Sequence, residues 1–570
     1  MKRLIGIGVG PGDPELVTVK AVRVLREADV VLVPVLAGPE SKPSEPEPPG
    51  PEPGRAETII RAYVAADRIK RLPFALNDTG GVTPRRAAAW QAAAAAVAQE
   101  FAAGAATVAF GTLGDPNLYS TFSYLAQAVR DLVPEVTVET VAGITAMQDL
   151  ASRAGLSLAE GTEPVTLVPL NGGVDALDQA LAHGGTVVGY KVGAAASPAP
   201  GILRDRLQAA GRLDSAVIGA RLGLEGERIA PAAADISDIP YLSTLIVPAR
   251  RPAGAGAALP PRTQAQSNDI NATSLSPQQQ QCDIHAVIAG APEEQQSRKG
   301  RVVFVGAGPG APDLLTHRGA RAIAQADIVI WASSLVDHRV LAHAAPHAEI
   351  VDSARLPMEG VLPYYQQAAQ QNLQIARVHS GDPSLWGAIA EQLEQCTQLG
   401  LDTQIVPGVS SFTAVAAKIQ RELTVPEVAQ SVILTRLGGG KTPMPPREQV
   451  KDFARHGTTM ALFLSAARSG QLQDELQKGG YPPDTPCVVA YQVTWPDELI
   501  IHTALQDLAA TIKKHKLWKH TLVLVGPALA GPTKTRSHLY HPGHFHEYRK
   551  ADRQARMQLR TKRDTKQDGP

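Results

Sequence analysis

The chain contains one loop pattern twice, and this duplication limits the possible folds more than any other feature. A stretch that begins at Gly6 reads GIGVGPGDPELVTVKAVRVLREADVVLVP, and one that begins at Gly306 reads GAGPGAPDLLTHRGARAIAQADIVIWA. Two further landmarks recur in the same order: GTLGDPNLYS (111–120) returns as VHSGDPSLWG (378–387), and ETVAGITAM (139–147) returns as QIVPGVSSF (404–412). Three landmarks in one order, at a period far longer than that of a solenoid repeat, predict two homologous domains in tandem.

Each copy alternates between strand-like and helix-like segments. RLIGIGVG reads as a strand, residues 16–28 place apolar side chains at mostly helical spacing, and DVVLVPV reads as a strand again. Such alternation predicts an α/β fold with a mainly parallel sheet. Ligands of these sheets bind at loops beyond the carboxyl ends of strands, and all three repeated landmarks lie at such places.

The predicted boundaries follow from composition. Residues 251–299 are rich in Pro, Gln, Ser and small residues without apolar periodicity, so we expect a flexible linker between a domain at 1–250 and a domain at 300–548. Residues 549–570 are mostly charged and predict a disordered tail. Residues 38–57 form a Pro/Glu-rich insertion that is too rich in proline for a helix or a central strand.

The composition excludes several classes of protein. Lys+Arg and Asp+Glu are both 55, and this balance disfavours a generic nucleic-acid binder. No run of about 18 apolar residues occurs, so we expect no membrane span. Glycine and proline interrupt the apolar start too early for a signal peptide, and the alanine-rich stretch at 87–104 reads as a soluble helix. The three cysteines, which have no metal-ligand spacing, fit a reduced cytoplasmic setting: Cys282, Cys396 and Cys487.

The glycine loops allow more than one interpretation. A dinucleotide-binding fingerprint would need a third glycine, but Pro11 takes that place in the first copy and Pro309 interrupts the second. Proline also removes a backbone N–H that should donate to a pyrophosphate, and no P-loop lysine follows. A tight strand-to-helix turn without a ligand is the purely structural alternative. Asp115 and Asp382 in the Gly-Asp-Pro turns could likewise fix their own turns, point a carboxylate at a ligand, or do both.

The combination G-x-G-P-G, G-D-P and P-G-[IV]-[ST]-[AS] resembles the tetrapyrrole methylases of corrin and sirohaem synthesis. The resemblance covers nearly all of both halves. It implies an S-adenosylmethionine-dependent methyltransferase with two tandem domains, each two-lobed and with the cofactor in the cleft between its lobes. Residues 1–250 look like precorrin-2 C(20)-methyltransferase, on GVGPGDPELVTVKAVRVLREADVV, FGTLGDPNLYSTFSYLAQAV, VAGITAMQDLASRAG and PYLSTLIVP. Residues 300–548 look like precorrin-4 C(11)-methyltransferase, on WASSLVD, HSGDPSLWGAIAEQ, VPGVSSFTAVAAKIQRELTVPEVAQSVILTR and GGYPPDTPCVVAYQVTWPDE.

The resemblance also implies a set of cofactor contacts. In the first half these are Pro11, Gly114, Asp115, Leu118, Thr145, Ala146 and Tyr190. In the second half they are Pro309, Ser380, Gly381, Asp382, Leu385, Ser410, Ser411 and Leu464. Ala142 and Ala311 replace the family's usual Pro and Asp, and we expect small effects because the neighbouring backbone carries the contacts.

The resemblance supplies no acid–base residue, because Pro34 or Val35 and Ala332 or Ser333 occupy the places where sirohaem-pathway relatives have an Asp. The precorrin substrates carry many carboxylates, which suit arginine. The candidate substrate-binding residues are Arg85, Arg86, Arg436 and Arg468. Glu227 and Glu498 coincide between the halves, and their role could be purely structural. The histidines at 538, 541, 544 and 546 match no standard metal spacing, so we expect no metal site.

Three functional classes follow from these observations. A bifunctional, cytoplasmic C-methyltransferase of cobalamin biosynthesis is favoured by the combination of motifs. A nicotinamide-dinucleotide-dependent oxidoreductase and a non-catalytic tetrapyrrole-binding scaffold are the alternatives. Expected partners are precorrin substrates, with or without cobalt, and not nucleic acid or a membrane. Single-copy members of the family form dimers, so each half should pack against its like, within one chain or in a homodimer.

Overall fold

A computed structural model of the chain describes residues 1–36, 53–75, 84–194, 197–234, 239–251, 299–426, 428–439, 443–445 and 448–530. Almost all of the predicted linker, the predicted tail, the histidine-rich segment, Cys282 and most of the Pro/Glu-rich insertion lie outside these ranges. In the described ranges, no helix combines the length and the apolar character that crossing a membrane requires.

The first half begins with a lobe built on a five-stranded parallel sheet in the order β3-β2-β4-β1-β5. Its strands are β1 (Arg3–Gly8), β2 (Val30–Leu36), β3 (Ile69–Phe74), β4 (Thr107–Thr112) and β5 (Thr137–Val141). Its helices are α1 (Val19–Glu27), α2 (Arg55–Ile60), α3 (Pro84–Ala102) and α4 (Phe122–Leu132). The alanine-rich segment is therefore a helix, as its composition predicts.

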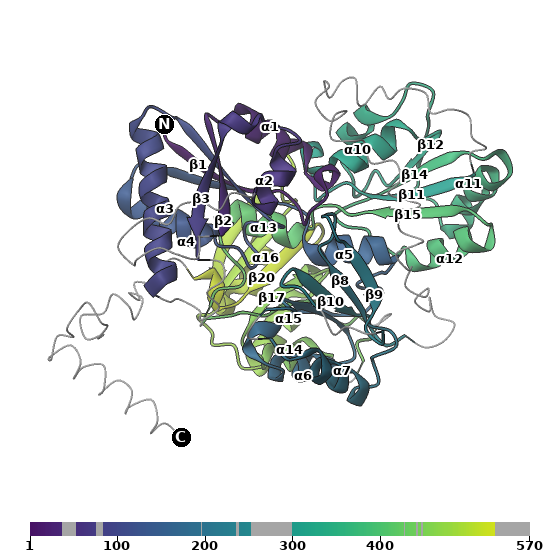
Figure 1. Cartoon of the computed structure of the whole chain (residues 1–570). Coiled ribbons are helices and arrows are strands. Elements are labelled where there is room, and N and C mark those ends of the chain that lie inside the picture. Colours follow the sequence, from purple (N-terminus) through teal and green to yellow (C-terminus); the bar gives the residue numbers. More distant parts are fainter. Residues whose placement is uncertain are drawn as a thin grey trace.

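The second half repeats this lobe with the strand order β13-β12-β14-β11-β15. Its strands are β11 (Arg301–Gly306), β12 (Ile328–Trp331), β13 (Glu349–Asp352), β14 (Gln374–His379) and β15 (Asp402–Val406). Its helices are α10 (His317–Ala324), α11 (Met358–Gln371) and α12 (Ala390–Gln398). Figure 1 shows the two first lobes, purple on the left and teal on the right, which approach each other at α1 and α10.

The remaining segments of both halves meet in one sheet of ten strands, in the order β19-β18-β20-β17-β16-β6-β7-β10-β8-β9. The first half contributes α5 (Ala146–Ala154), β6 (Val165–Pro169), α6 (Asp175–Ala182), β7 (Thr186–Tyr190), α7 (Pro200–Ala209), β8 (Val217–Ala220), β9 (Arg228–Pro231) and β10 (Ser243–Val247). The second half contributes α13 (Ser411–Ile419), β16 (Val432–Arg436), α14 (Val450–Ala454), β17 (Thr459–Phe463), α15 (Ser469–Lys478), β18 (Pro486–Tyr491), β19 (Leu499–Ala504), α16 (Leu508–His515) and β20 (Thr521–Val525).

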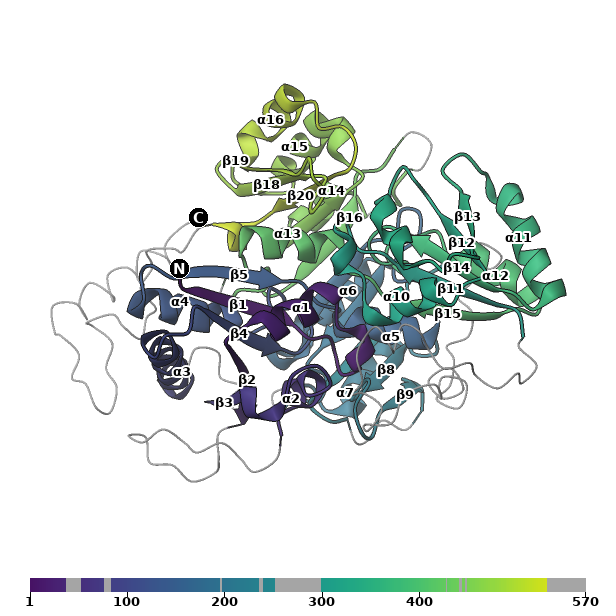
Figure 2. The same cartoon turned by 90° about the horizontal axis from the view of Figure 1, so that it is seen from above.

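The two halves are joined at the antiparallel pair β6–β16, where Val432 lies opposite Leu167 and Leu434 opposite Val165. The strand order reads the same outward from this pair in both directions, so the halves are related by an approximate twofold axis. The two-lobed α/β architecture expected for each half is confirmed, and the packing of like against like occurs within one chain (Figure 2).

Contacts between the first lobes follow the same symmetry. Thr18 and Thr316 cap α1 and α10 and form an isolated antiparallel bridge with each other. Arg318 of α10 donates to Asp13 and Glu15 of the first half, so an ion-pair cluster lies at this contact. The largest core cluster also contains side chains of both halves, among them Leu150, Leu158, Phe412 and Leu434. We call the contact between the two halves, along β6–β16 and between the first lobes, the seam. Since one apolar core spans this seam, the halves are packed units of a single molecule.

Candidate functional site

The strand-to-helix loops of the first half are held together by close glycine contacts. A Cβ atom added to Gly143 would lie 2.2 Å from the carbonyl oxygen of Gly114, and one added to Gly8 would lie 2.6 Å from the same atom. The second half repeats this stack with Gly306, Gly381 and Gly408, where a Cβ on Gly408 would lie 2.2 Å from the Gly381 oxygen. Only glycine allows three loops to approach this closely. Because each half has such a stack, each half needs the same glycine pattern.

The structure changes one detail of the alignment between the copies. Gly8 ends β1 opposite Thr112, and Gly306 ends β11 opposite His379, so Gly306 corresponds to Gly8 and not to Gly6. A Cβ on Gly6 would lie 2.5 Å from the ring of Phe122, whereas the corresponding residue of the second half is Phe304. Gly6 is therefore a packing position that leaves room for a phenylalanine ring.

Asp115 and Asp382 are buried in the Gly-Asp-Pro turns and tie the loops together. Asp115 accepts the backbone N–H of Asn117 at 2.8 Å and that of Gly143 at 3.0 Å. Asp382 accepts the N–H of Ser384 at 2.9 Å and that of Gly408 at 3.1 Å. Each carboxylate thus fixes its own turn and the neighbouring glycine loop, which is the structural role considered for these residues.

Burial raises the pKa of both carboxyl groups, to about 7 for Asp115 and to about 6 for Asp382. Hydrogen bonds from the backbone oppose this rise in both turns. Asp382 receives further bonds from the Ser384 hydroxyl and the Gln148 side chain, which favour its charged form more strongly.

All seven residues predicted as cofactor contacts in the first half line one cavity of about 180 Å³: Pro11, Gly114, Asp115, Leu118, Thr145, Ala146 and Tyr190. The structure adds wall residues that the motifs did not indicate, notably Tyr119, Lys191, Arg221, Leu222 and Tyr241. The Tyr119 and Tyr190 rings lie 5.0 Å apart, and the Lys191 ammonium lies 5.3 Å from the centre of the Tyr119 ring. The cavity therefore has an aromatic wall with a cation beside it.

The corresponding residues of the second half take equivalent positions in its loops. Gly308 and Gly381 form the same isolated bridge as Gly10 and Gly114. Trp386 packs on Phe463 with 4.7 Å between ring centres, as Tyr119 packs on Tyr190. Phe463 is thus the counterpart of Tyr190, while the predicted contact Leu464 follows it with 69% of its surface exposed.

Both turns leave backbone open to a ligand. A Cβ on Gly114 would have only the Ile144 oxygen within reach, at 4.0 Å, and one on Gly381 would have only the Val409 oxygen, also at 4.0 Å. Both glycines have positive φ values, 68° and 66°. Each half therefore has an open backbone surface at the glycine of its Gly-Asp-Pro turn, which we call its cradle. The residues present fit a ligand that lies flat against this turn.

The four candidate arginines fall into two groups. The charge of Arg86 acts on Lys191 and Tyr241 of the first cavity, whereas Arg85 lies on an exposed position of α3. Arg436 lies opposite Phe463 in the sheet, and its pKa is lowered by burial and by the charge of Arg468. Arg468 itself donates to the carbonyl groups of Leu437 and Gly438.

Glu227 and Glu498 have matching roles in the two halves. Glu227 accepts the N–H of Gly223 at 2.6 Å and pairs with Arg153. Glu498 accepts the N–H of Thr494 at 2.5 Å and pairs with Lys418. Both glutamates hold a turn against the helix that follows the glycine loop, so their contacts are structural.

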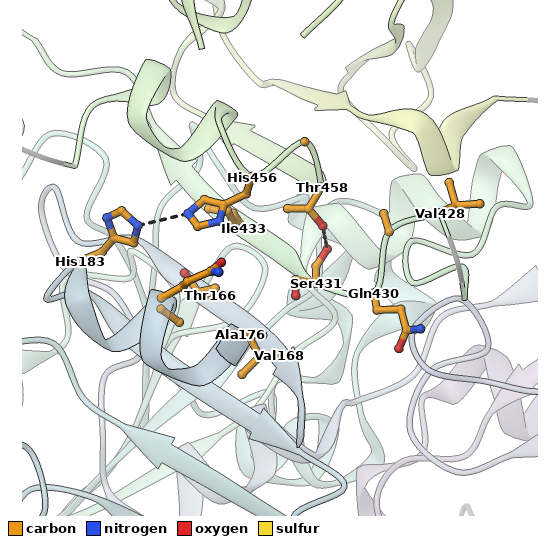
Figure 3. Close-up of a pocket in the computed structure, with 14 residues that line it drawn as sticks. Thr166, Val168, Ala176, His183, Val428, Gln430, Ser431, Ile433, His456 and Thr458 are labelled. Atoms are coloured by element: carbon orange, nitrogen blue, oxygen red, sulfur yellow. Dashed lines mark hydrogen bonds between the residues drawn. The ribbon is translucent and has the colours of Figure 1, made fainter. Parts of the chain in front are cut away.

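A separate polar cavity of about 250 Å³ lies at the seam beside the β6–β16 pair (Figure 3). His183 of the first half and His456 of the second half both line it and contact each other, with 3.1 Å between their Nε2 atoms. None of the predicted site residues lines this cavity. Among the described residues, no group of three or more His, Cys, Asp or Glu side chains is placed to hold a metal ion.

Comparisons with known proteins agree with the duplicated architecture. The family model of the tetrapyrrole (corrin/porphyrin) methylases matches residues 3–236 and 301–509. A cobalt-precorrin-4 C(11)-methyltransferase of Methanocaldococcus jannaschii is 42% identical over 251 residues, which are 44% of this chain and 96% of that protein. A precorrin-4 C(11)-methyltransferase of Mycobacterium tuberculosis is 41% identical over 239 residues, which are 42% of this chain and 95% of that protein. The X-ray structure of a cobalt precorrin-4 methyltransferase covers 40% of this chain and 96% of its own, with 39% identity and a TM-score of 0.40.

Proposed function

Because the chain belongs to the family of tetrapyrrole (corrin/porphyrin) methylases, we propose that it is a bifunctional S-adenosylmethionine-dependent methyltransferase of corrin-ring (cobalamin) biosynthesis. Each half holds one cofactor molecule in the cleft between its lobes. One observation carries this proposal: a buried aspartate, an open glycine and a close glycine stack recur in both halves.

The two clefts act on different precorrins. The second half methylates precorrin-4, or its cobalt form, at C-11: the sequence stretches of residues 300–548 support this assignment, and relatives of that name match a part of the chain about the size of one half at 42% and 41% identity. The first half methylates precorrin-2, or its cobalt form, at C-20; this assignment rests on the sequence stretches of residues 1–250 alone.

The cofactor, when bound, supplies a methyl group on a positively charged sulfur. In the first cleft it would be held by Pro11, Gly114, Asp115, Leu118, Thr145, Ala146 and Tyr190. In the second it would be held by Pro309, Ser380, Gly381, Asp382, Leu385, Ser410 and Ser411, with Phe463 at the end of β17 or Leu464 directly after it. Product S-adenosylhomocysteine would occupy the same contacts.

The chain contributes mainly position and orientation, which are large terms in bimolecular transfer. The open backbone of Gly114 and the aromatic pair Tyr119–Tyr190 define where a flat ligand lies, and the apolar Leu118 and Leu222 exclude water. Lys191, Arg86 and Arg221 make this end of the first cleft positive, which suits a substrate rich in carboxylates.

The direct test is incubation of the purified full-length chain with methyl-labelled S-adenosylmethionine and either precorrin-2 or precorrin-4, followed by mass analysis. We expect one added methyl group on each substrate. Asp115→Ala should abolish methylation of precorrin-2 and Asp382→Ala that of precorrin-4, because each carboxylate holds the loops of one cleft. Stabilisation by NAD(H) but not by S-adenosylmethionine in a thermal-shift assay would instead indicate the oxidoreductase.

A further inference from the structure

The Gln148 side chain lies between the two clefts and bonds to residues of both. It belongs to α5 of the first half and is fully buried. Its Oε1 accepts the backbone N–H and the hydroxyl of Thr145, each at 2.9 Å. Its Nε2 donates to Asp382 Oδ2 at 3.1 Å and to the Gly408 carbonyl at 2.7 Å, both in the second half. Every hydrogen-bonding atom of this side chain therefore serves a loop of one cleft or the other.

The arrangement is not symmetric. The counterpart of Gln148 in α13 is Thr413, which donates to the Ser410 carbonyl of its own half at 3.0 Å and is too short to reach the other cleft. In the described part of the chain, Asp115 accepts only from Asn117 and Gly143. The first half thus reaches into the Gly-Asp-Pro turn of the second half without an equivalent bond in return.

Other contacts across the seam support the first cleft from the second half. The Thr424 hydroxyl accepts the N–H of Tyr119 at 2.7 Å, and Glu422 accepts the N–H of Ser120 at 3.1 Å. These bonds hold the segment that carries the aromatic wall, but they do not touch the aspartate or the glycine stack. Gln148 differs because it contacts the residues that shape the second cradle directly.

We propose that Gln148 is a positioning residue shared by the two cofactor clefts, and that it completes the second cleft from the first half. This inference rests on the proposed function, since it assigns the support of the cofactor sites. The amide fixes Asp382 and Gly408 relative to each other, and these two residues set the open side of Gly381. Because the same amide fixes Thr145, a shift of either loop acts on the other cleft.

Two variants test the amide, one by removing both of its ends and one by changing only the end that faces the second cleft. Gln148→Thr introduces the residue found at the equivalent helix position, so the helix turn tolerates it, but it removes the bonds to both clefts. We expect S-adenosylhomocysteine to bind both clefts of the full-length chain more weakly, with a loss of roughly tenfold at the second, the scale of one lost hydrogen bond to a charged group. Calorimetric titration gives the two affinities, and the same titration in the Asp115→Ala background, in which the first cleft is disabled, identifies the second cleft.

Gln148→Glu keeps an oxygen for Thr145 but turns a second oxygen toward Asp382 and Gly408. At about pH 8 the two carboxylates repel each other, so the second cleft should weaken at least tenfold while the first keeps its affinity. At about pH 5.5 one shared proton restores a donor, and the second cleft should recover. Each affinity is compared with that of the wild type at the same pH, because the raised pKa values of Asp115 and Asp382 mean that both also gain protons over this range. Recovery relative to wild type, confined to the second cleft, would not follow from a merely structural defect.

Ser152→Ala is the matched control, because Ser152 on the same helix also donates across the seam, but to the Ile405 carbonyl of β15 and not to Asp382 or Gly408. It should leave both affinities within about twofold. The inference fails if Gln148→Thr leaves both affinities unchanged, if Ser152→Ala weakens binding equally, or if Gln148→Glu shows no dependence on pH. If the wild-type chain binds no S-adenosylhomocysteine, the proposed function fails instead.

Discussion

Glu422 shows how a single residue at the seam couples protonation to stability. Its carboxylate is buried and accepts the N–H of Ser120 and the hydroxyls of Ser123 and Thr424, at 3.1, 2.9 and 2.8 Å. Burial raises the pKa of this carboxyl group to about 7. A raised pKa means that the folded state keeps its proton where the unfolded chain has already lost it.

We therefore expect Glu422→Gln to change how stability depends on pH. Between about pH 4.5 and pH 7 the folded wild type binds more protons than the unfolded chain at this site, so its free energy of unfolding falls as pH rises through that window. Glutamine does not titrate and has nearly the same shape, so the variant should gain stability relative to wild type by up to about 3 kcal/mol at pH 8. Chemical denaturation of both proteins at several pH values measures the difference. A constant difference across the window would contradict the raised pKa.

At the scale of elements, the sequence motifs and the apolar patterns predict the strands, the helices and the repeated loops well. They place Asp115 and Asp382 in equivalent turns and bring seven residues to one cavity. They do not fix the register where glycine recurs at every second position, so Gly6 and Gly8 look interchangeable until packing against Phe122 separates them. The sheet register makes Phe463, at the end of β17, the counterpart of Tyr190, and the predicted contact Leu464 is the next residue.

The contacts across the seam could not be predicted from either half. Gln148 and Glu422 lie 234 and 302 residues from their partners Asp382 and Ser120. Both residues lie inside stretches that carry the family resemblance, but a buried glutamine in a short helix has no periodic signature, and the letters do not say which distant residues either side chain contacts. Such residues are recognised only once the β6–β16 pairing has set the halves against each other.

The glycine stack leads to a prediction about the loops. Gly143→Ala would place a methyl group 2.2 Å from the Gly114 oxygen, so the loops must separate and cofactor binding in the first cleft should be lost, with about 1–3 kcal/mol of destabilisation. Gly408→Ala should do the same in the second cleft. Gly201→Ala in α7 is the control, because no atom lies within 4 Å of the added methyl group and stability should rise slightly. Equal binding by Gly143→Ala and wild type would show that the stack does not shape the cleft.

At the scale of the whole molecule, the duplication places like surfaces against each other inside one chain. The β6–β16 pair, the Thr18–Thr316 bridge and the Arg318 ion pairs all join residues of opposite halves. A homodimer that used these surfaces would have to open the existing seam first. We therefore expect the chain to sediment as a monomer of 60.1 kDa, and sedimentation as a dimer would contradict this prediction.

Cleavage between the halves tests whether the seam or the covalent link holds the molecule together. Residues 251–299 are rich in Pro and Gln without apolar periodicity, so mild proteolysis should cut there first. We expect the two fragments to stay associated, because one apolar core and one ten-stranded sheet cross the seam and neither depends on the linker. Size-exclusion chromatography should show the nicked protein at the volume of the intact chain, with both cofactor affinities retained, and denaturing electrophoresis should show two bands. Fragments that separate at micromolar concentration and each keep full affinity would mean that neither cleft needs the opposite half. Fragments that separate and lose binding would mean that the linker, and not the seam alone, maintains the paired arrangement.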